Sequence, residues 1–449
     1  MGMGCNPEHT SIDVFAHCRD RRSVDICVRR TSAQMRSTST VCRARGWRAA
    51  PQRGLRTSLS AICVAMAALL SADGAAAQSA GAPRGKPSTG LSNAGDPQVF
   101  GTRRQRSTGS FWTPERMRDA EPRDLPSVTP DQVGPAYLPE STAGAGDSRS
   151  QPGVAPGIDV PPDFDNQLFE PHEPELVPEL DPAFQFEAPL SASPDGALFT
   201  NSRVFPREAL TAYPYRAAGK LFYHDPVQNV DFVCSGSVIQ RRLVVTAGHC
   251  VYDAEQGYAY TNFRFVPGYD EGVAPFGAWD AEQALTTLSW AEGGGRVPNA
   301  GDFAILVITD QFVEGTGVAI GQLVGWLGWQ TEVVANSHVT MLGYPGNLDS
   351  GQRMQQTAAQ TFALVEPNAA EFGSAQGGGS SGGPYVLNFG ELAEGQDEPV
   401  QNRVVGIMSY GYSDLATGQP LGQAGTSIIN GEFVALLEAA CQAGPDNCL

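Results

Sequence analysis

Short apolar runs alternate with turn residues through the chain from Phe199 onward. The runs are rich in β-branched and aromatic side chains, and glycine, asparagine, aspartate or proline bounds them. This pattern predicts strands, and many strands with little helix between them indicate an all-β sandwich or barrel. The clearest runs read GKLFYH, FVCSGSVI, RLVVTAGHCV, NFRFVPG, FAILVI, HVTMLGYPG, YVLNF and RVVGIMSYGY.

One helix is expected near the C-terminus, in NGEFVALLEAACQAG. Asn430 can cap its first turn, because an asparagine side chain accepts from a free backbone N–H there. Four apolar residues fall on one face at helical spacing: Phe433, Leu436, Leu437 and Ala440.

Residues 78–198 differ in composition from the later part of the chain. They are rich in proline and acidic residues and show no sustained apolar period. Such a segment buries too little surface to offset its ordering entropy. We therefore expect a disordered acidic, Pro-rich pro-region or linker over 78–198 and a folded domain over 199–449. Scattered aromatic residues such as Phe169 could dock on that domain, but a disordered tail is the expected state.

An apolar run between Thr57 and Gln78 follows three arginines and closes on small residues near Ala77. This is the layout of a secretory signal peptide, and the run is too short for a membrane anchor. We expect a signal peptide over 46–77, a spurious upstream extension over 1–45, and a secreted or periplasmic product without a stable membrane anchor.

The formal net charge of -18 bears on the possible partners. Residues 1–56 carry eleven Arg and four acidic residues, whereas the rest of the chain is acidic. Nucleic-acid binding through a basic face is therefore not expected of the mature protein.

Four of the nine cysteines lie beyond the predicted signal peptide. Export would place them in an oxidising compartment, where disulfides form. Four cysteines allow three connectivities, and the sequence does not choose among them. The simplest is local pairing, Cys234 with Cys250 and Cys441 with Cys448.

Two polar residues lie at the ends of apolar runs. His249 follows a strand in VVTAGHCVYD, and Asp302 precedes one in NAGDFAILVI. Taken singly, a histidine or a turn aspartate is more often structural. The region after the signal peptide offers only three other histidines: His172, His224 and His338.

The stretch AQGGGSSGGPYV reads first as a flexible linker. It ends abruptly in Pro384 and an apolar strand, however, and a glycine turn can converge backbone N–H groups on an oxyanion. The GSSGG within it also fits the G-x-S-x-G elbow of α/β-hydrolases, but that fold needs a histidine after the serine. The order His249, Asp302, Ser381 is that of the chymotrypsin architecture.

The motifs CSGSVI, VVTAGHCV, GDFAIL, GSSGGP, GIMSYG and LGYPG together resemble the secreted bacterial trypsin-like serine peptidases related to the V8-like glutamyl endopeptidases. The resemblance covers roughly residues 199–449. It implies two six-stranded Greek-key β-barrels with the active site between them. It also implies a serine endopeptidase that hydrolyses polypeptide substrates.

Residue roles carried over by the resemblance centre on three motifs. His249 is the implied general base, Asp302 its orienting acid and Ser381 the nucleophile. The N–H groups of Gly379 and Ser381 are the implied oxyanion hole. An edge for the substrate backbone and a pocket for its side chain are implied for Ser409, Tyr410, Gly411, Ala375, Gln376 and Met408.

Two departures limit what the resemblance implies. Ser380 stands where trypsin-like enzymes of animals have the aspartate that pairs with the activated N-terminus, so that activation route is not expected. Met408 replaces the pocket histidine of the glutamyl endopeptidases, and Ala375 replaces the pocket aspartate of trypsins. Neither glutamate nor basic specificity follows, and a neutral residue before the cleaved bond is favoured.

No metal or organic cofactor is implied, because the histidines and cysteines show no ligand spacing. We expect a monomer. The alternative interpretation is a catalytically silent binding protein on the same fold.

Overall fold

The computed structural model describes residues 99–101, 110–129, 132–133, 148–157, 168–169, 199–313, 315–331, 337–390, 401–413 and 420–448. The expected upstream extension (1–45) and signal peptide (46–77) lie outside these residues. Among the described helices, none is long and apolar enough to cross a membrane.

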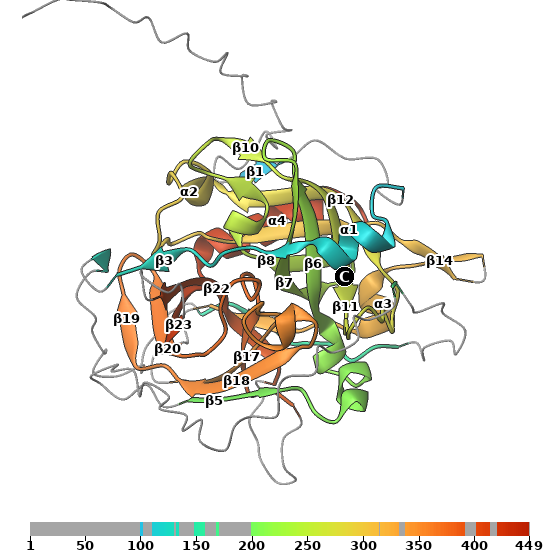
Figure 1. Cartoon of the computed structure of the whole chain (residues 1–449). Coiled ribbons are helices and arrows are strands. Elements are labelled where there is room, and N and C mark those ends of the chain that lie inside the picture. Colours follow the sequence, from blue (N-terminus) through green and yellow to red (C-terminus); the bar gives the residue numbers. More distant parts are fainter. Residues whose placement is uncertain are drawn as a thin grey trace, which may run out of the picture. The chain divides into compact units, whose positions relative to one another are not determined.

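The first barrel is a closed ring of six antiparallel strands (Figure 1). Around the ring the order is β12-β11-β6-β7-β8-β13, and pairing of β12 with β13 closes it. The strands are β6 (Ala218–Asp225), β7 (Val230–Gln240), β8 (Leu243–Thr246), β11 (Thr261–Pro267), β12 (Trp279–Thr287) and β13 (Ala304–Ile308).

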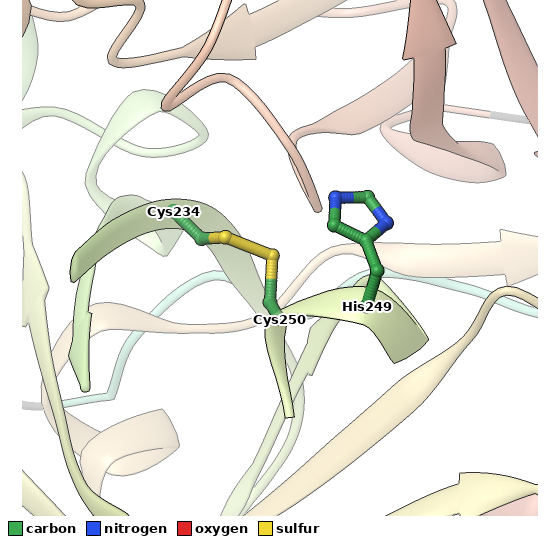
Figure 2. A group of neighbouring side chains, drawn as sticks. All are labelled: Cys234, His249 and Cys250. Carbon is green, nitrogen blue, oxygen red and sulfur yellow. A yellow bond between two sulfur atoms is a disulfide. The ribbon is translucent and has the colours of Figure 1, made fainter. Parts of the chain in front are cut away.

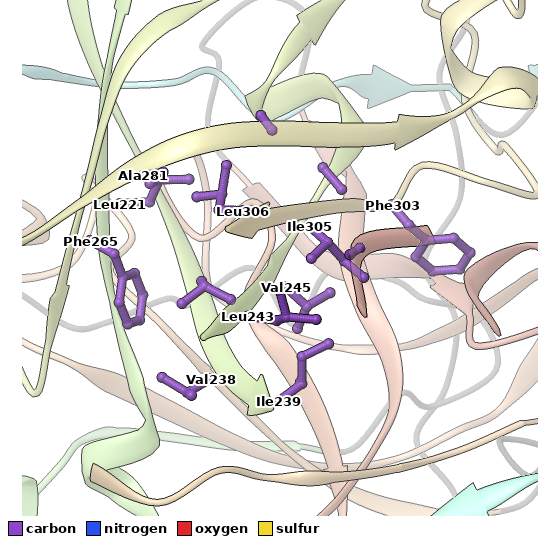
Figure 3. Packing of buried hydrophobic residues seen from close by; sticks show 14 of the residues in the cluster. Leu221, Val238, Ile239, Leu243, Val245, Phe265, Ala281, Phe303, Ile305 and Leu306 are labelled. Carbon is purple, nitrogen blue, oxygen red and sulfur yellow. The ribbon is translucent and has the colours of Figure 1, made fainter. Parts of the chain in front are cut away.

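Apolar side chains fill this barrel because its shortest strands are buried on both faces. Every residue of β8 and β13 is buried, and Figure 3 shows Leu243 and Val245 packed near Ile305 and Leu306. The cluster continues into the second sheet through Val404 and Ile407. A core of this size holds the strand ends rigidly, and those ends carry the candidate site.

The second sheet runs in the order β19-β20-β23-β22-β21-β17-β18-β5, with β16 beside β22. The strands are β5 (Phe199–Arg203), β16 (Gly328–Gln330), β17 (His338–Gly343), β18 (Gln355–Gln360), β19 (Ala363–Val365), β20 (Ala369–Gly373), β21 (Pro384–Leu387), β22 (Arg403–Ser413) and β23 (Pro420–Ile428). The predicted all-β class is confirmed. In the described residues this ladder is an open sheet that curls into a half-barrel, at the place where a second six-stranded Greek-key β-barrel was expected.

Helices are few. The C-terminal helix α4 (Gly431–Gln442) has the predicted cap, since the Asn430 side chain accepts from the N–H of Phe433. Its apolar face packs on the first barrel, with the Phe433 and Phe303 rings 5.6 Å apart. The structure pairs Cys441 with Cys448 just beyond it. The other helices are α1 (Pro114–Asp119), α2 (Leu288–Ala291) and α3 (Ile320–Val324).

The remaining elements are short. Two small antiparallel pairs are formed by β9 (Tyr252–Asp253) with β10 (Tyr258–Ala259) and by β14 (Gln311–Val313) with β15 (Thr316–Val318). Single 3-10 turns are η2 (Arg207–Thr211), η3 (Tyr215–Ala217), η4 (Gly248–Cys250) and η5 (Asp349–Gly351).

Residues before 199 differ from the expected disordered segment wherever the structure describes them. Four short strands add to the two sheets: β1 (Val99–Gly101) pairs β12, β2 (Glu121–Pro122) pairs β7, β3 (Ser127–Val128) pairs β22 and β4 (Ser150–Gln151) pairs β16. Phe169 is buried against the domain. Strands of two or three residues are too short to give a sequence period, so the pattern could not reveal them.

Candidate active site

His249 and Asp302 meet because adjacent strands deliver them to one end of the first barrel. Ala304 of β13 pairs with Thr246 of β8, so Asp302, two residues before β13, and the turn after β8 become neighbours. The Nδ1 of His249 lies 2.8 Å from Oδ2 of Asp302, and its backbone N–H donates to Oδ1 at 2.9 Å. His249 is 4% exposed and Asp302 is 0% exposed. The carboxylate therefore fixes both the ring and the backbone of His249.

Ser409 supplies a third donor to the same carboxylate. Its hydroxyl donates to Oδ2 of Asp302 at 2.6 Å from the middle of β22. The sequence placed Ser409 on the substrate edge through its backbone, and the structure assigns its side chain to holding Asp302. The second sheet thus helps to orient a group of the first barrel.

Cys250 follows His249 directly and is bonded to Cys234 of β7, with the two Cα atoms 6.4 Å apart (Figure 2). The disulfide ties the His249 turn to the neighbouring strand. Cys234, His249 and Cys250 are also the one group in the described residues that is spaced like a metal site. The two sulfurs are bonded to each other, so they do not offer the thiolates that a metal needs.

The Ser381 turn is shaped by glycines at left-handed backbone angles. Gly379 has φ of 90° and Gly382 has φ of 81°. A Cβ on Gly382 would lie 2.0 Å from Oγ1 of Thr246 and 2.8 Å from the N of Ala247. Because only glycine permits this approach, the Ser381 turn packs directly against the chain that leads into His249.

Ser381 is buried, and its Oγ makes no hydrogen bond within the described structure. The Nε2 of His249 is likewise buried and makes none there. The structure thus joins His249, Asp302 and Ser409 by hydrogen bonds and places the Ser381 turn against them. It does not join Ser381 to His249.

The sequence did not single out Ser235 of β7, which ties the Ser381 turn to the first barrel. Its N–H donates to the carbonyl of Ser381 at 2.7 Å, and its hydroxyl donates to the carbonyl of Gly379 at 2.9 Å. The same hydroxyl accepts from the N–H of Tyr344 at 2.9 Å. Its place beside Cys234 was the only available signal, and that signal does not predict these contacts.

Trp290 is a second residue that the sequence did not mark. Its ring lies 5.9 Å from the His249 ring in an edge contact, and its indole N–H donates to the carbonyl of Tyr252 at 3.0 Å. A Cβ on Gly248 would approach this ring to 2.7 Å. Trp290 therefore backs the histidine turn and limits its movement.

Of the predicted oxyanion donors, Gly379 already has a partner. Its N–H donates to the carbonyl of Arg123 at 2.8 Å. Gly411, on the predicted substrate edge, donates its N–H to the carbonyl of Pro126 at 3.0 Å. Both predicted substrate-binding groups thus contact one segment that precedes the barrels.

Ser380 takes part in the turn itself. Its hydroxyl donates to the carbonyl of Gly377 at 2.6 Å, and its carbonyl accepts from the N–H of Gly383 at 2.9 Å. Ser380 thus closes the turn around Ser381 by local hydrogen bonds.

The predicted pocket residues have separate surroundings. Ala375 is half-buried, and its carbonyl accepts from the Asn347 amide at 2.9 Å. Gln376 is buried and donates to Oγ1 of Thr357 at 3.0 Å. Met408 is fully buried in an apolar cluster.

Tyr410 is held from behind by an acid that the sequence did not mark. Its hydroxyl donates to Glu371 at 3.1 Å, and Gln423 donates to the other carboxylate oxygen at 2.8 Å. Burial raises the pKa of Glu371, while these donors and Tyr412 act in the opposite direction. Glu371 therefore fixes the back of the 409–411 edge.

Several known proteins are similar to this chain. Residues 211–428 match the family described as Trypsin. The glutamyl endopeptidase of Bacillus licheniformis is 27% identical over 176 residues, which are 39% of this chain and 49% of that protein. An extracellular metalloprotease of Bacillus subtilis (strain 168) is 26% identical over 193 residues, 41% of this chain and 55% of that protein.

The chain thus spans about half the length of the curated relatives it matches. A solved structure of the protease Anisep from Arthrobacter nicotinovorans aligns with a TM-score of 0.43 and 23% identity, over 54% of this chain and 98% of that one. The predicted resemblance is confirmed by the family match and the endopeptidase relative.

Proposed function

We propose that this chain is a serine endopeptidase acting through an acyl-enzyme on Ser381, and the match of residues 211–428 to the Trypsin family supports the proposal. The observation that carries the proposal is the set of hydrogen bonds around Asp302, which holds His249 and is itself held by Ser409. Acyl transfer requires a histidine pinned in this way and a serine on a glycine turn, and here that turn packs against the chain that leads into His249.

In the proposed reaction, His249 Nε2 takes the proton of the Ser381 hydroxyl as Oγ attacks the substrate carbonyl carbon. The tetrahedral oxyanion accepts from the N–H groups of Gly379 and Ser381. The His249 imidazolium then protonates the leaving amine as the C–N bond breaks. Water, deprotonated by the same ring, releases the acyl group and restores Ser381. Asp302 stays ionised and keeps the ring oriented throughout.

Export, polypeptide substrates and a monomeric state are part of the proposal. The layout of residues 46–77 and the two disulfides support an oxidising compartment outside the cytoplasm. Specificity for a neutral residue stays a prediction, supported by the absence of a charged side chain at Ala375 and Met408.

Cleavage of a defined peptide mixture by the purified full chain tests the function. We expect new peptide termini in the wild-type sample and none with Ser381→Ala, with Ser380→Ala as the neighbouring serine control. Folded protein without any cleavage, both in the wild type and in the Leu125→Asp variant described below, would favour the silent binding protein.

A further inference from the structure

We propose that residues 121–128, here called the strap, hold the active site closed. They lie in the site with their chain running in the direction opposite to that of a bound substrate. The strap joins the two sheets (Figure 1, cyan): β2 pairs with β7, and β3 pairs with β22. This inference deepens the proposed function, on which it rests, by assigning the regulation of the same site.

The strap uses the groups that a substrate needs. The carbonyl of Arg123 accepts from Gly379, the predicted oxyanion donor, at 2.8 Å. The carbonyl of Pro126 accepts from Gly411, on the predicted substrate edge, at 3.0 Å. A substrate backbone cannot take these donors while the strap holds them, so strap and substrate compete.

Side chains of the strap pack where substrate side chains would pack. Leu125 packs against the cluster that contains Met408, and its Cδ2 would lie 2.5 Å from a Cβ on Gly411. Pro122 lies against Gly379, with its Cβ 3.2 Å from where a Cβ would stand there. Burial of both Ser381 Oγ and His249 Nε2 agrees with a covered site.

Chain direction explains why the strap persists in a protease. The leaving half of a substrate follows the attacked carbonyl and must lie on the His249 side, because His249 protonates the leaving amine. Val233 lies on the His249 side, because it precedes Cys234, which is bonded to Cys250, the residue after His249.

In the strap, the residues that precede the Arg123 carbonyl lie on this side instead. Pro122 is paired with Val233, and the Arg123 N–H donates to the Val233 carbonyl at 3.0 Å. The residues that follow the carbonyl run to the opposite edge, where Ser127 is paired with Gly411.

This polarity blocks hydrolysis of the strap. Attack of Ser381 on the Arg123 carbonyl would require the Asp124 nitrogen to leave, and that nitrogen lies toward the Gly411 edge, away from His249. An adduct formed there lacks a proton donor for its leaving group and reverts. The strap therefore acts as an inhibitor and not as a substrate.

Contacts outside the site hold the strap in place. Trp112 donates its indole N–H to the carbonyl of Asn262 at 2.6 Å, and Met117 of α1 is buried. Arg116 forms a 2.7 Å ion pair with Asp231 at the start of β7. Within the strap, the Arg123 guanidinium lies 5.1 Å from the centre of the Phe232 ring. A tethered segment has a high effective concentration at its site, so modest contacts suffice.

The test compares the rates at which a fluorophosphonate labels Ser381 in the intact full chain and its variants. Leu125→Asp removes the apolar contact of the strap, and Val154→Asp makes the same change at a partly exposed position outside the site. We expect Leu125→Asp to label about 10- to 100-fold faster than wild type, as loss of a packed leucine shifts a closed-open equilibrium. Val154→Asp should label at the wild-type rate.

Equal labelling of wild type and Leu125→Asp would overturn the strap and leave the protease standing. No labelling of any folded form would overturn the proposed function, and the strap with it. Arg123→Ala provides a second variant in which the strap should leave the active site, if Leu125→Asp does not fold.

A peptide of residues 119–129, added to the Leu125→Asp chain, tests the direction of binding. We expect it to inhibit cleavage of other peptides and to remain uncut between Arg123 and Asp124. Rapid cleavage at that bond would contradict the reversed polarity.

Discussion

The Ser409 hydroxyl donates to Oδ2 of Asp302, the same oxygen that faces Nδ1 of His249. A residue of the second sheet thus shares an acceptor with the candidate general base of the first barrel. This contact distinguishes an orienting role for Ser409 from the substrate contact expected from the sequence.

Ser409→Ala should lower kcat/KM about tenfold in the Leu125→Asp background, because Asp302 loses one charge-assisted hydrogen bond and keeps two. Asp302→Asn in the same background should cost about 10⁴-fold, since it presents the wrong partner to the imidazole. Peptide hydrolysis rates measure both. Equal losses in the two variants would contradict the separate roles.

Ser235→Ala should destabilise the chain by about 1–3 kcal/mol, because the Gly379 carbonyl and Tyr344 N–H both lose their partner in a buried place. Ser237→Ala, two residues along the same strand, is the matched control. The Ser237 hydroxyl is buried and makes no hydrogen bond within the described structure. Denaturant unfolding should show little change for Ser237→Ala, and a similar loss in both variants would refute the bridging role of Ser235.

Gly382→Ala should be far more damaging than Gly390→Ala. Both residues have positive φ, so both substitutions carry backbone strain of about 1 kcal/mol. At Gly382 the new Cβ also meets Thr246 Oγ1 at 2.0 Å, whereas nothing lies within 4 Å at Gly390. Thermal unfolding of the two variants isolates the steric part, and a comparable decrease in Tm would argue against close packing of the nucleophile turn.

The burial of Lys220 should make the stability of the folded chain depend on pH. Lys220 is 2% exposed, its Nζ donates to the Gly351 carbonyl at 2.8 Å, and burial lowers its pKa to about 7. Between pH 7 and about 10 the unfolded chain therefore binds the proton and the folded chain does not. The free energy of unfolding should rise with pH across this window by about 3 kcal/mol from this residue.

Lys220→Met should remove that rise and stabilise the chain most at pH 7 and below, where the folded wild type carries the buried charge. Denaturant unfolding at several pH values between 7 and 10 measures the slope. The same slope in wild type and variant would show that Lys220 keeps an ordinary pKa in the folded chain.

Much of the fold could be predicted because strands such as β8 and β13 are continuous apolar runs whose length and composition specify them. His249 and Asp302 stand at the ends of these runs, so the sequence could propose them together. The short strands β2 and β3 could not be predicted. They form by pairing with β7 and β22, and their own residues show no alternation of apolar and polar positions.

Contacts made through backbone atoms were also beyond sequence reasoning. Ser235 and Gly379 are joined by a hydroxyl and a carbonyl, and any residue type supplies the carbonyl. Glu371 behind Tyr410 depends on the pairing of β20 with β23, which residue patterns do not specify.

Mapping of a covalent adduct shows whether Ser381 is the residue that carries the acyl group. The Leu125→Asp chain is treated with a fluorophosphonate, digested and sequenced by mass spectrometry, beside versions that also carry Ser380→Ala or Ser381→Ala. We expect one adduct per chain, located on Ser381, that persists in Ser380→Ala and disappears in Ser381→Ala. An adduct on Ser380, or one that survives Ser381→Ala, would rule out Ser381 as the nucleophile.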